Sequence, residues 1–344
     1  MEPKMTIKEI AELAGVSKST VSRYLNQGYV SAEKAEQVRR VIEETGYQTN
    51  FFAKRLKMKY SKLVGIVLPR MDSVAVGKLL TGIHRVFRTN GYQGLLMVSN
   101  LSIEKELENI LSLQQQGVDG IIIDSVGITQ QHIELQASLD VPTIFTGQRH
   151  PQVRYIKFDD YAAGRMMGSY LKETQHKHVV FVGVNESDTA VGIERKKGFM
   201  DAFLENNEGA KADFIEAGFD FFSAYNCAVR VLQFQPTAVV GATDNICLGL
   251  LRYFHEQKIR VPEECSVAGF GGYDVGAVVY PALTTVSFDY ELVGMKTAQG
   301  MLTLIRGEEF SSDASLPLFF VERESVRRMG EAVAQKKPAK FIGM

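Results

Sequence analysis

Residues 6–50 of the chain read TIKEIAELAGVSKSTVSRYLNQGYVSAEKAEQVRRVIEETGYQTN. This stretch predicts two helices joined by a tight turn and followed by a third helix. Thr6 with Glu9 three residues later is a capping box, so the first helix begins there. Gly15 predicts the turn, because a residue without a Cβ tolerates the left-handed conformation, and Ser17 predicts the cap of the second helix. We interpret the segment as a helix-turn-helix.

The apolar residues of these helices predict a small shared core. Its expected members are Ile7, Ile10, Ala11, Leu13 and Ala14, then Val21, Tyr24 and Leu25, then Ala35, Val38, Val41 and Ile42 of a helix that Ser31 caps. The outward face of the second helix keeps Lys18, Ser19, Thr20, Ser22 and Arg23. Short hydroxyls with Lys and Arg suit the DNA major groove, because Ser and Thr reach phosphates or base edges and Arg pairs with guanine. The alternative is a generic three-helix module with a solvated polar face.

Residues 6–68 resemble the lactose/galactose-repressor (LacI/GalR) family of bacterial regulators. The headpiece pattern of that family, T-hydrophobic-x-D/E-[IV]-A-x-x-A-G-V-S-x-x-T-V-S-R-x-L-N, is matched at every position up to Asn26. The resemblance extends over nearly the whole chain, and it implies that Lys18, Ser19 and Arg23 contact operator bases. It also implies a homodimer on a near-palindromic operator, as helix-turn-helix dimers require. The candidate DNA contacts of the headpiece are Thr6, Ser17, Lys18, Ser19, Thr20, Ser22, Arg23, Asn26 and Tyr29.

Residues 46–62, GYQTNFFAKRLKMKYSK, predict a hinge after the headpiece. The family pattern there is Y-x-P-N-x-x-A-R-x-L, and the resemblance implies a helix that folds on the operator. Its candidate contacts are Asn50, Ala53, Lys54 and Leu56. Leu56 is the expected minor-groove wedge, because an apolar side chain can unstack a base step and kink the duplex. Thr49 in place of Pro and Lys54 in place of Arg predict a more mobile hinge without DNA, and a flexible basic linker is the alternative.

Charge divides the chain into a basic head and an acidic body. The whole chain has 39 Lys and Arg against 40 Asp and Glu, for a net charge of −1. Residues 1–62 hold 12 basic and 7 acidic side chains, so their net charge is +5 and that of the remainder is −6. This asymmetry fits phosphate neutralisation by the head alone. It does not fit a protein that coats nucleic acid with its whole surface.

Composition excludes further classes of protein. The longest apolar runs, such as LVGIVL and HVVFVG, have strand length and are too short to span a membrane. The start, MEPKMTIKE, does not have the pattern of a signal peptide. We therefore expect a cytoplasmic, nucleoid-associated protein. Cys227, Cys247 and Cys265 are expected to be buried thiols, and a solvated turn is favoured over a metal site at His176 and His178. Neither a metal nor a cofactor is expected.

From Leu63 onward, buried strands alternate with amphipathic helices, which predicts a parallel, doubly wound α/β architecture. A first series contains the strands LVGIVLP, GLLMVSN, GIIIDS and PTIFTG. A second series begins near Asp159 with HVVFVG, AVVGA, SVAGF and LTTVSF. Two such halves in tandem predict a clamshell that binds a ligand at the carboxyl ends of its strands. The family resemblance implies a periplasmic-binding-protein-like core of this kind.

The expected domains follow from these patterns. The DNA-binding headpiece spans residues 1–49, the hinge helix or linker 50–62, and the effector-binding and dimerisation core 63–344. Within the core, lobe 1 is expected at about 63–158 plus 289–320 and lobe 2 at about 159–288, as α/β halves of this size allow.

An enzyme, or a transport-type sugar-binding protein with a DNA-binding head, is the rival class for the core. Gly269, Gly271 and Gly272 follow a strand but lack the G-x-G-x-x-G spacing of a dinucleotide site. The sequence contains no Walker lysine motif, no G-x-S-x-G elbow and no H-E-x-x-H. No catalytic residue is assigned, and a ligand-gated DNA-binding regulator is the favoured class.

The strand ends and the loops after them supply the candidate effector contacts. These are Arg70, Asp72, Ser73, Asp124, Gln148, Arg149, Asp188, Arg195, Thr243, Asp244, Tyr273 and Tyr290. The resemblance implies that Arg195, which matches R-x-x-G-F/Y, lies over a sugar and that Thr243 and Asp244 line the cleft. A surface Arg on a helix start is the alternative for Arg195, and a mobile-loop Arg is the alternative for Arg149.

Two departures from the family bear on the charge of the effector. Many relatives carry an acidic pair in G-F-D-D, where this chain has Gly271 and Gly272. Arg70 stands where relatives place a small or acidic residue. Fewer anions and an added guanidinium favour an anionic ligand, because Arg binds phosphate bidentately. The segments PRMDS, SDTAVGIER, ATD and the Tyr of SFDY also resemble the trehalose-repressor branch, which senses trehalose 6-phosphate.

We therefore expect a repressor of a carbohydrate-uptake or catabolism operon that a sugar phosphate controls. Trehalose 6-phosphate and sucrose 6-phosphate are examples, and a neutral sugar or a nucleoside is the alternative. Induction with release of the operator is expected, and corepression stays open. In either case the ligand can change DNA affinity only as far as it discriminates between two lobe arrangements.

Overall fold

The computed structural model describes residues 5–26, 28–47, 60–311 and 316–330. The chain forms two compact units, Met1–Ser61 and Lys62–Met344. Each unit is described by itself.

The first unit contains the three predicted helices, α1 (Ile7–Leu13), α2 (Lys18–Leu25) and α3 (Ala32–Thr45). The capping box of Thr6 and Glu9 is present, and Ser17 accepts a hydrogen bond from the Thr20 amide. Gly15 has a φ of 63°, as the turn requires. Ser31 occupies the N-cap of α3 but makes no side-chain capping hydrogen bond. The helix-turn-helix prediction is confirmed.

The core of this unit is formed by Ile10, Ala11, Ala14, Val21, Val38 and Val41. Leu13 was expected inside, but it is 59% exposed. Successive helix residues are rotated by about 100°, so Leu13 points away from the face that its neighbour Ala14 shares with Ile10. The inward face of α1 is therefore narrower than the sequence pattern indicates.

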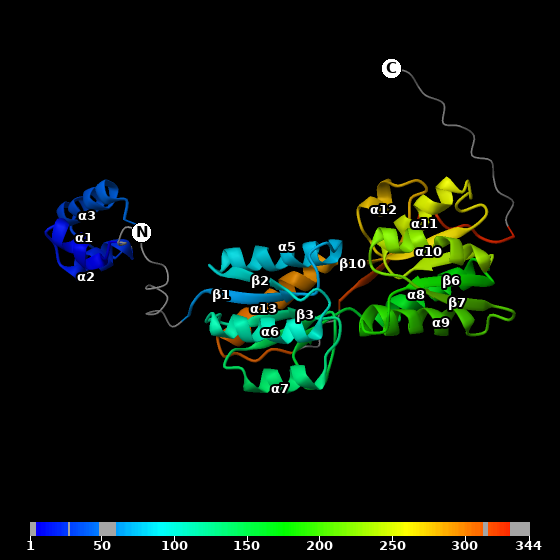
Figure 1. The fold of residues 1–344 in the computed structure, drawn as a ribbon, viewed down its shortest axis with the longest axis horizontal. Coiled ribbons are helices and arrows are strands. Elements are labelled where there is room, and N and C mark those ends of the chain that lie inside the picture. Colours follow the sequence, from blue (N-terminus) through cyan, green and yellow to red (C-terminus); the bar gives the residue numbers. More distant parts are fainter. Residues whose placement is uncertain (1–4, 27, 48–59, 312–315, 331–344) are drawn as a thin grey trace, which may run out of the picture. The chain divides into compact units, whose positions relative to one another are not determined.

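The second unit contains two α/β lobes. The first lobe has a five-stranded parallel sheet of order β2-β1-β3-β4-β5. Its strands are β1 (Leu63–Leu68), β2 (Gln93–Val98), β3 (Ile121–Asp124), β4 (Thr143–Thr146) and β5 (Tyr155–Ile156). α5 (Val74–Thr89) and α13 (Tyr290–Ile305) cover one face, and α6 (Ile103–Gln115) and α7 (Gln130–Ser138) cover the other (Figure 1).

The second lobe has a six-stranded sheet of order β11-β10-β9-β8-β6-β7, in which only the β10–β11 pair is antiparallel. Its strands are β6 (His178–Gly183), β7 (Lys211–Glu216), β8 (Ala238–Gly241), β9 (Ser266–Gly271), β10 (Thr284–Phe288) and β11 (Leu318–Val321). α8 (Asp160–Glu173) and α9 (Lys196–Leu204) lie on one face, and α10 (Phe221–Gln233) and α11 (Asp244–Glu256) on the other (Figure 1). The doubly wound architecture is thereby confirmed.

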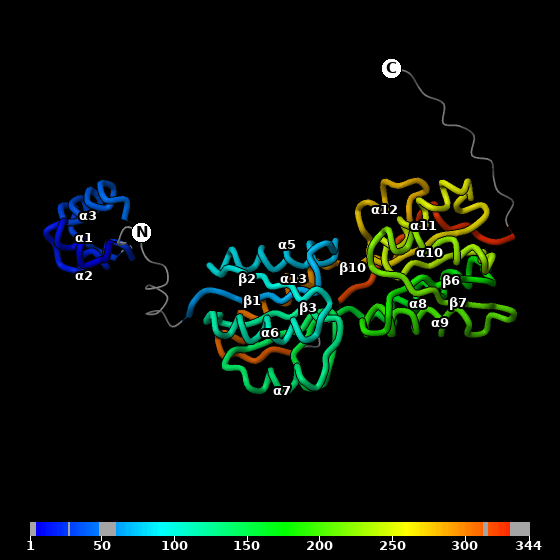
Figure 2. The backbone as a smooth tube through the Cα atoms, viewed as in Figure 1, coloured from blue at the N-terminus to red at the C-terminus, as the bar shows by residue number. Residues whose placement is uncertain are grey.

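Four short elements were not predicted: β5, β11, a π-helix η1 (Thr189–Arg195) and α12 (Val275–Val278). The placement of β11 corrects the expected lobe boundary, because residues 318–320 were assigned to lobe 1 and lie in the second sheet. β11 is a short edge strand that pairs with β10 in the antiparallel direction, and such a strand needs no crossover helix before it. The sequence therefore gives no local signal that the chain goes back to the second sheet. The chain passes between the lobes after β5, after β10 and before β11 (Figure 2).

The histidines and cysteines have structural surroundings. His176 was expected in a solvated turn, but it is fully buried, with its ring nitrogens 3.0 Å from Thr237 Oγ1 and 3.1 Å from the Arg327 carbonyl oxygen. Burial lowers the pKa of His176 to about 4. The three cysteines are free and buried, as expected. Among the described residues, no cluster could hold a metal ion, and no helix is long and apolar enough to cross a membrane.

Candidate functional site

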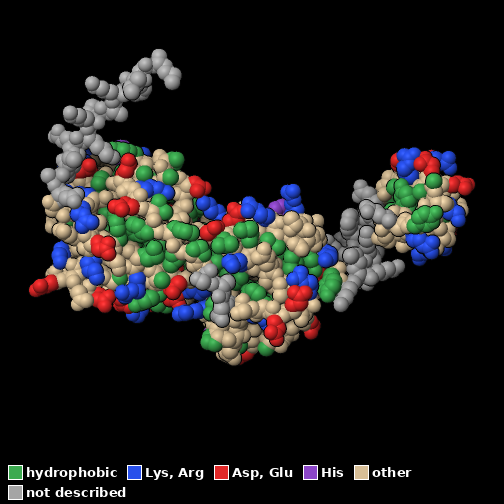
Figure 3. All heavy atoms as spheres, turned by 180° about the vertical axis from the view of Figure 1, so that it is seen from behind, with side chains coloured by type: hydrophobic (Ala, Val, Ile, Leu, Met, Phe, Trp, Pro, Cys, Tyr) green, Lys and Arg blue, Asp and Glu red, His purple; other side chains and the backbone are tan. Residues whose placement is uncertain are grey.

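The exposed face of α2 carries free positive charge. Lys18 and Arg23 are exposed, and neither has an ion-pair partner among the described residues. On α3, by contrast, Arg39 lies 2.5 Å from Glu36 and 3.0 Å from Glu43. Figure 3 shows Lys and Arg side chains on the surface of this unit. Lys18 and Arg23 are therefore uncompensated on the helix predicted to enter the groove, where they can meet phosphate or base edges.

Several other candidate DNA contacts have local partners. Ser17 Oγ lies 2.8 Å from Ser19 Oγ and 2.9 Å from Thr20 Oγ1, so the three hydroxyls cluster at the start of α2. Asn26 Nδ2 donates to the Ser22 carbonyl, and Thr6 serves the capping box of α1. Tyr29 is 92% exposed. The hinge candidates Asn50, Ala53, Lys54 and Leu56 lie outside the described residues.

The second unit has two adjoining cavities at the carboxyl ends of the strands of both sheets. The inner chamber has a volume of about 160 Å³, and the outer chamber about 850 Å³. Of the predicted effector contacts, the inner chamber is lined by Arg70, Ser73, Asp124, Gln148, Asp188, Arg195, Thr243, Tyr273 and Tyr290. Asp72 lines the outer chamber, and Arg149 and Asp244 line neither.

Burial raises the pKa values of two carboxyl groups in the inner chamber. Burial raises the pKa of Asp124 to about 7, although the Thr146 hydroxyl donates to it at 2.8 Å. Burial also raises the pKa of Asp188 to about 6. Asp188 Oδ1 accepts from the Val191 amide at 2.9 Å and from Gln148 Nε2 at 3.2 Å, and Gln148 belongs to the other lobe. These groups repel an anion less than ordinary aspartates would.

Arg195 is committed to a buried ion pair. It lies at the end of η1 and is only 5% exposed. Its Nη2 and Nε donate to Asp160 Oδ1 at 2.6 and 3.1 Å, and its Nη1 donates to the Ala242 carbonyl at 2.6 Å. The alternative of a surface Arg is wrong. Asp160 neutralises the guanidinium, so Arg195 supplies little net positive charge to the chamber.

Arg70 retains donors for a ligand. Its side chain is 17% exposed, and its Nε lies 2.9 Å from Asp72 Oδ1 without the alignment of a hydrogen bond. Its guanidinium carbon lies 5.1 Å from the centre of the Phe219 ring, which belongs to the other lobe. Arg70 lines both chambers and therefore stands at the junction between them.

The Gly271–Gly272 pair shapes the inner chamber. Gly271 has a φ of 140° and Gly272 a φ of 67°, and both conformations favour glycine. The turn is held by Asp244, whose Oδ2 accepts from the Tyr273 amide at 2.8 Å and whose Oδ1 accepts from Thr285 Oγ1 at 2.7 Å. A Cβ on Gly271 would lie 2.7 Å from Tyr273 Cε1. The sequence showed only the loss of two acids, whereas the glycines also let the Tyr273 ring fold back into the chamber.

Sequence reasoning missed three residues of this region. Lys157 is buried beside Asp160 and Glu194, and Phe219 lies at the junction of the chambers. Asp160 and Lys157 follow the two-residue strand β5, which has no periodic pattern. Phe219 lies three residues after the end of β7, and this position near a strand end was the signal that could have found it. Arg149 lies 3.4 Å from Glu194 on the surface.

The two units together define a regulator in which a small DNA-binding head accompanies a two-lobed ligand-binding core. Residues 6–50 match the family described as bacterial regulatory proteins, lacI family, and residues 169–326 match the periplasmic binding protein-like domain. The sucrose operon repressor of Staphylococcus xylosus is 37% identical over 290 residues, covering 84% of this chain and 90% of that protein. The chain belongs to the lacI family of bacterial regulatory proteins.

Other relatives agree with this assignment. The transcriptional regulator TreR of Salmonella typhimurium is 29% identical over 89% of this chain and 96% of that protein. The crystal structure of the lac repressor dimer bound to operator and the anti-inducer ONPF has a TM-score of 0.85 at 25% identity, covering 94% of this chain and all of that chain. These relatives are DNA-binding transcriptional regulators, so the expected function class is confirmed and the enzyme alternative is set aside.

Proposed function

We propose that the protein is a cytoplasmic repressor of a carbohydrate-uptake or catabolism operon, and that a sugar phosphate in the inner chamber releases it from its operator. Arg70 carries this proposal. Its guanidinium stands at the junction of the chambers, and its Nε makes no hydrogen bond, although it lies 2.9 Å from Oδ1 of Asp72, whose side chain is largely exposed. A phosphate there would gain charge-assisted hydrogen bonds. Arg195 is not assigned to the phosphate, because Asp160 compensates its charge.

The surroundings of Arg70 support an anionic ligand. The raised pKa of Asp124, about 7, leaves this carboxyl group partly protonated near neutral pH and so reduces the negative charge in the chamber. Tyr273 and Tyr290 line the inner chamber, and a phenol can donate to a phosphate oxygen. The name of one relative, the sucrose operon repressor, agrees with a disaccharide-related effector.

On the DNA side, the proposal assigns base contacts to Lys18, Ser19 and Arg23 of a homodimer on a near-palindromic operator. The lac repressor structure is a dimer on its operator. Hinge residues 50–62 would add minor-groove contacts, with Leu56 as the wedge. Effector binding changes the lobe arrangement, and by linkage it changes operator affinity to the same extent that the operator changes effector affinity.

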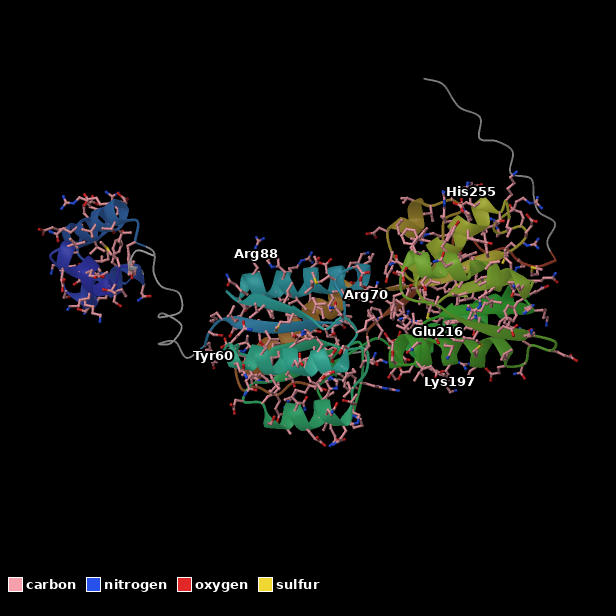
Figure 4. All side chains as sticks on the ribbon, in the orientation of Figure 1. Tyr60, Arg70, Arg88, Lys197, Glu216 and His255 are labelled. Atoms are coloured by element: carbon pink, nitrogen blue, oxygen red, sulfur yellow. The ribbon has the colours of Figure 1, made fainter. Side chains whose placement is uncertain are left out.

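Arg70→Ala tests the effector assignment. It should weaken binding of trehalose 6-phosphate or sucrose 6-phosphate by roughly 2–5 kcal/mol, because a partly buried charge pair is lost. Affinity for the unphosphorylated sugar should hardly change. Calorimetry with the full-length protein and each matched pair of sugars measures both effects. Arg88→Ala is the matched control, because Arg88 lies in the last turn of α5, lines neither chamber and is well separated from Arg70 in Figure 4.

A neutral sugar is the second candidate, and the carboxyl groups of Asp124, Asp160 and Asp188 favour it as hydroxyl acceptors. If the unphosphorylated member of a pair binds as tightly as the phosphate and Arg70→Ala has no effect, the phosphate assignment is wrong and the neutral sugar takes its place.

A further inference from the structure

The two chambers form one continuous groove. They share Arg70, Leu101, Val126, Asp188 and Phe219 in their linings. The inner chamber lies over the central strands of both sheets. The outer chamber extends toward β2 and β7, the strands at one edge of each sheet. A ligand at the junction can therefore reach both spaces.

The volumes set a limit on what the inner chamber holds. Its volume of about 160 Å³ is below the roughly 300–1,000 Å³ typical of small-molecule sites. The outer chamber alone falls within that range, at about 850 Å³. In this lobe arrangement, a ligand of more than about one sugar ring must extend past Arg70 and Phe219.

The outer chamber is lined by groups suited to sugar hydroxyls. Asn100 and Arg70 come from the first lobe, and Asn185, Glu216 and Ser223 from the second. Within the described part of the chain, the Asn100 side chain, Asn185 Nδ2 and the Glu216 carboxylate have no hydrogen-bond or ion-pair partner. In the inner chamber, by contrast, Asp124, Asp188 and Arg195 are already bonded. Figure 4 shows Arg70 and Glu216 on the two lobes where these face each other.

The same chamber offers an apolar surface. Phe219 lies at its junction with the inner chamber, and Leu101 from the first lobe lines both spaces. Leu101 is 47% exposed and has a φ of 64°, which is uncommon for a residue with a Cβ. An aromatic ring and an aliphatic side chain near free amide donors are the combination that sugars recognise, through their C–H faces and hydroxyl edges.

We propose that the outer chamber is a second sugar subsite, so that the effector has two sugar units, one in each chamber, with its phosphate beside Arg70 at the junction. This proposal rests on the proposed function, and it specifies in addition the size of the effector and where each of its sugar units binds. Asn100 and Asn185 stand on opposite lobes. A unit bound between them joins the lobes, and it therefore favours the closed arrangement more than a one-unit ligand can.

The test compares one-unit and two-unit ligands on the full-length protein. Glucose 6-phosphate, trehalose 6-phosphate and sucrose 6-phosphate are titrated by calorimetry, and operator affinity is measured at saturation with each. At least one of the two-unit phosphates should bind ten-fold or more tightly than glucose 6-phosphate and shift operator affinity further. The Asn100→Ala/Asn185→Ala variant should lose that ten-fold advantage and leave glucose 6-phosphate binding unchanged.

Asn226→Ala, an exposed asparagine on α10, is the matched control and should have no effect. Thermal unfolding of each variant shows that it is folded. If glucose 6-phosphate binds as tightly as both two-unit phosphates, or if the double variant binds every ligand like the wild type, the subsite is refuted. If unphosphorylated trehalose or sucrose shows the same two-unit advantage and the same loss in the double variant, the subsite holds and only the phosphate of the proposed function fails.

Discussion

Replacement of Gly271 by Asp introduces an acid beside Tyr273, and we expect it to disrupt the inner chamber. A side chain at φ 140° costs about 1–3 kcal/mol, since this backbone region is essentially restricted to glycine. The new Cβ would also lie 2.7 Å from Tyr273 Cε1, and overpacking of this kind costs about 1–3 kcal/mol. The unfolding free energy should therefore fall by roughly 2–6 kcal/mol. Sugar phosphate affinity should fall at least ten-fold, because Tyr273 is displaced and an anion is added.

Denaturant unfolding and effector calorimetry on the full-length protein measure these changes. Gly271→Ala adds the Cβ without the carboxylate, so the difference between Gly271→Ala and Gly271→Asp measures the effect of the added charge. Gly271→Ala with Tyr273→Ala should recover the steric part, giving a coupling energy of about 1–3 kcal/mol in a double-mutant cycle. Gly209→Ala is the control for backbone cost alone, because Gly209 has a φ of 71° and no atom within 4 Å of an added Cβ. The reasoning is refuted if Gly271→Asp unfolds like the wild type and keeps its effector affinity.

Three further predictions concern the DNA contacts, the helix packing and the pH dependence of stability. Lys18→Ala and Arg23→Ala should each cost about 1–3 kcal/mol in operator discrimination with a smaller loss on random DNA; equal losses in an anisotropy assay would reduce both to phosphate contacts. Gly82→Ala should destabilise the protein by roughly 1–3 kcal/mol, because its Cβ would clash with the Glu291 carbonyl across the α5–α13 contact. Gly77→Ala on the same helix, which has open space, should stabilise it by about 0.5–1 kcal/mol, and similar melting shifts for the two would contradict this account. Because burial raises the pKa of Asp124 to about 7, the native state binds a proton that the unfolded state releases, and this stabilisation is present at acid pH and lost as pH rises through 7. The stability of the wild type relative to Asp124→Asn should therefore fall between about pH 4 and pH 7 and change little above pH 7, and a constant difference would show that Asp124 does not bind this proton.

Much of the fold could be predicted because its cues are local. Caps at Thr6 and Ser17, the turn at Gly15 and the alternation of apolar strands with amphipathic helices depend on neighbours within a few residues. The location of the candidate site could also be predicted, since parallel strands bring their carboxyl ends to the same edge of a sheet. Ten of the twelve predicted effector residues line the two chambers for this reason.

The amino-acid sequence by itself determined the helix-turn-helix, the two α/β series and the strand-end position of the polar side chains, because each depends on short-range periodicity and turn chemistry. Only the tertiary structure decided what those side chains do. Asp160 is 35 residues from Arg195 and neutralises it, Asp244 holds the turn at Tyr273, and β11 returns to the second sheet. Each of these contacts joins segments far apart in the chain. Tertiary packing and burial determine which residues pair in these contacts, and a local sequence pattern cannot predict them.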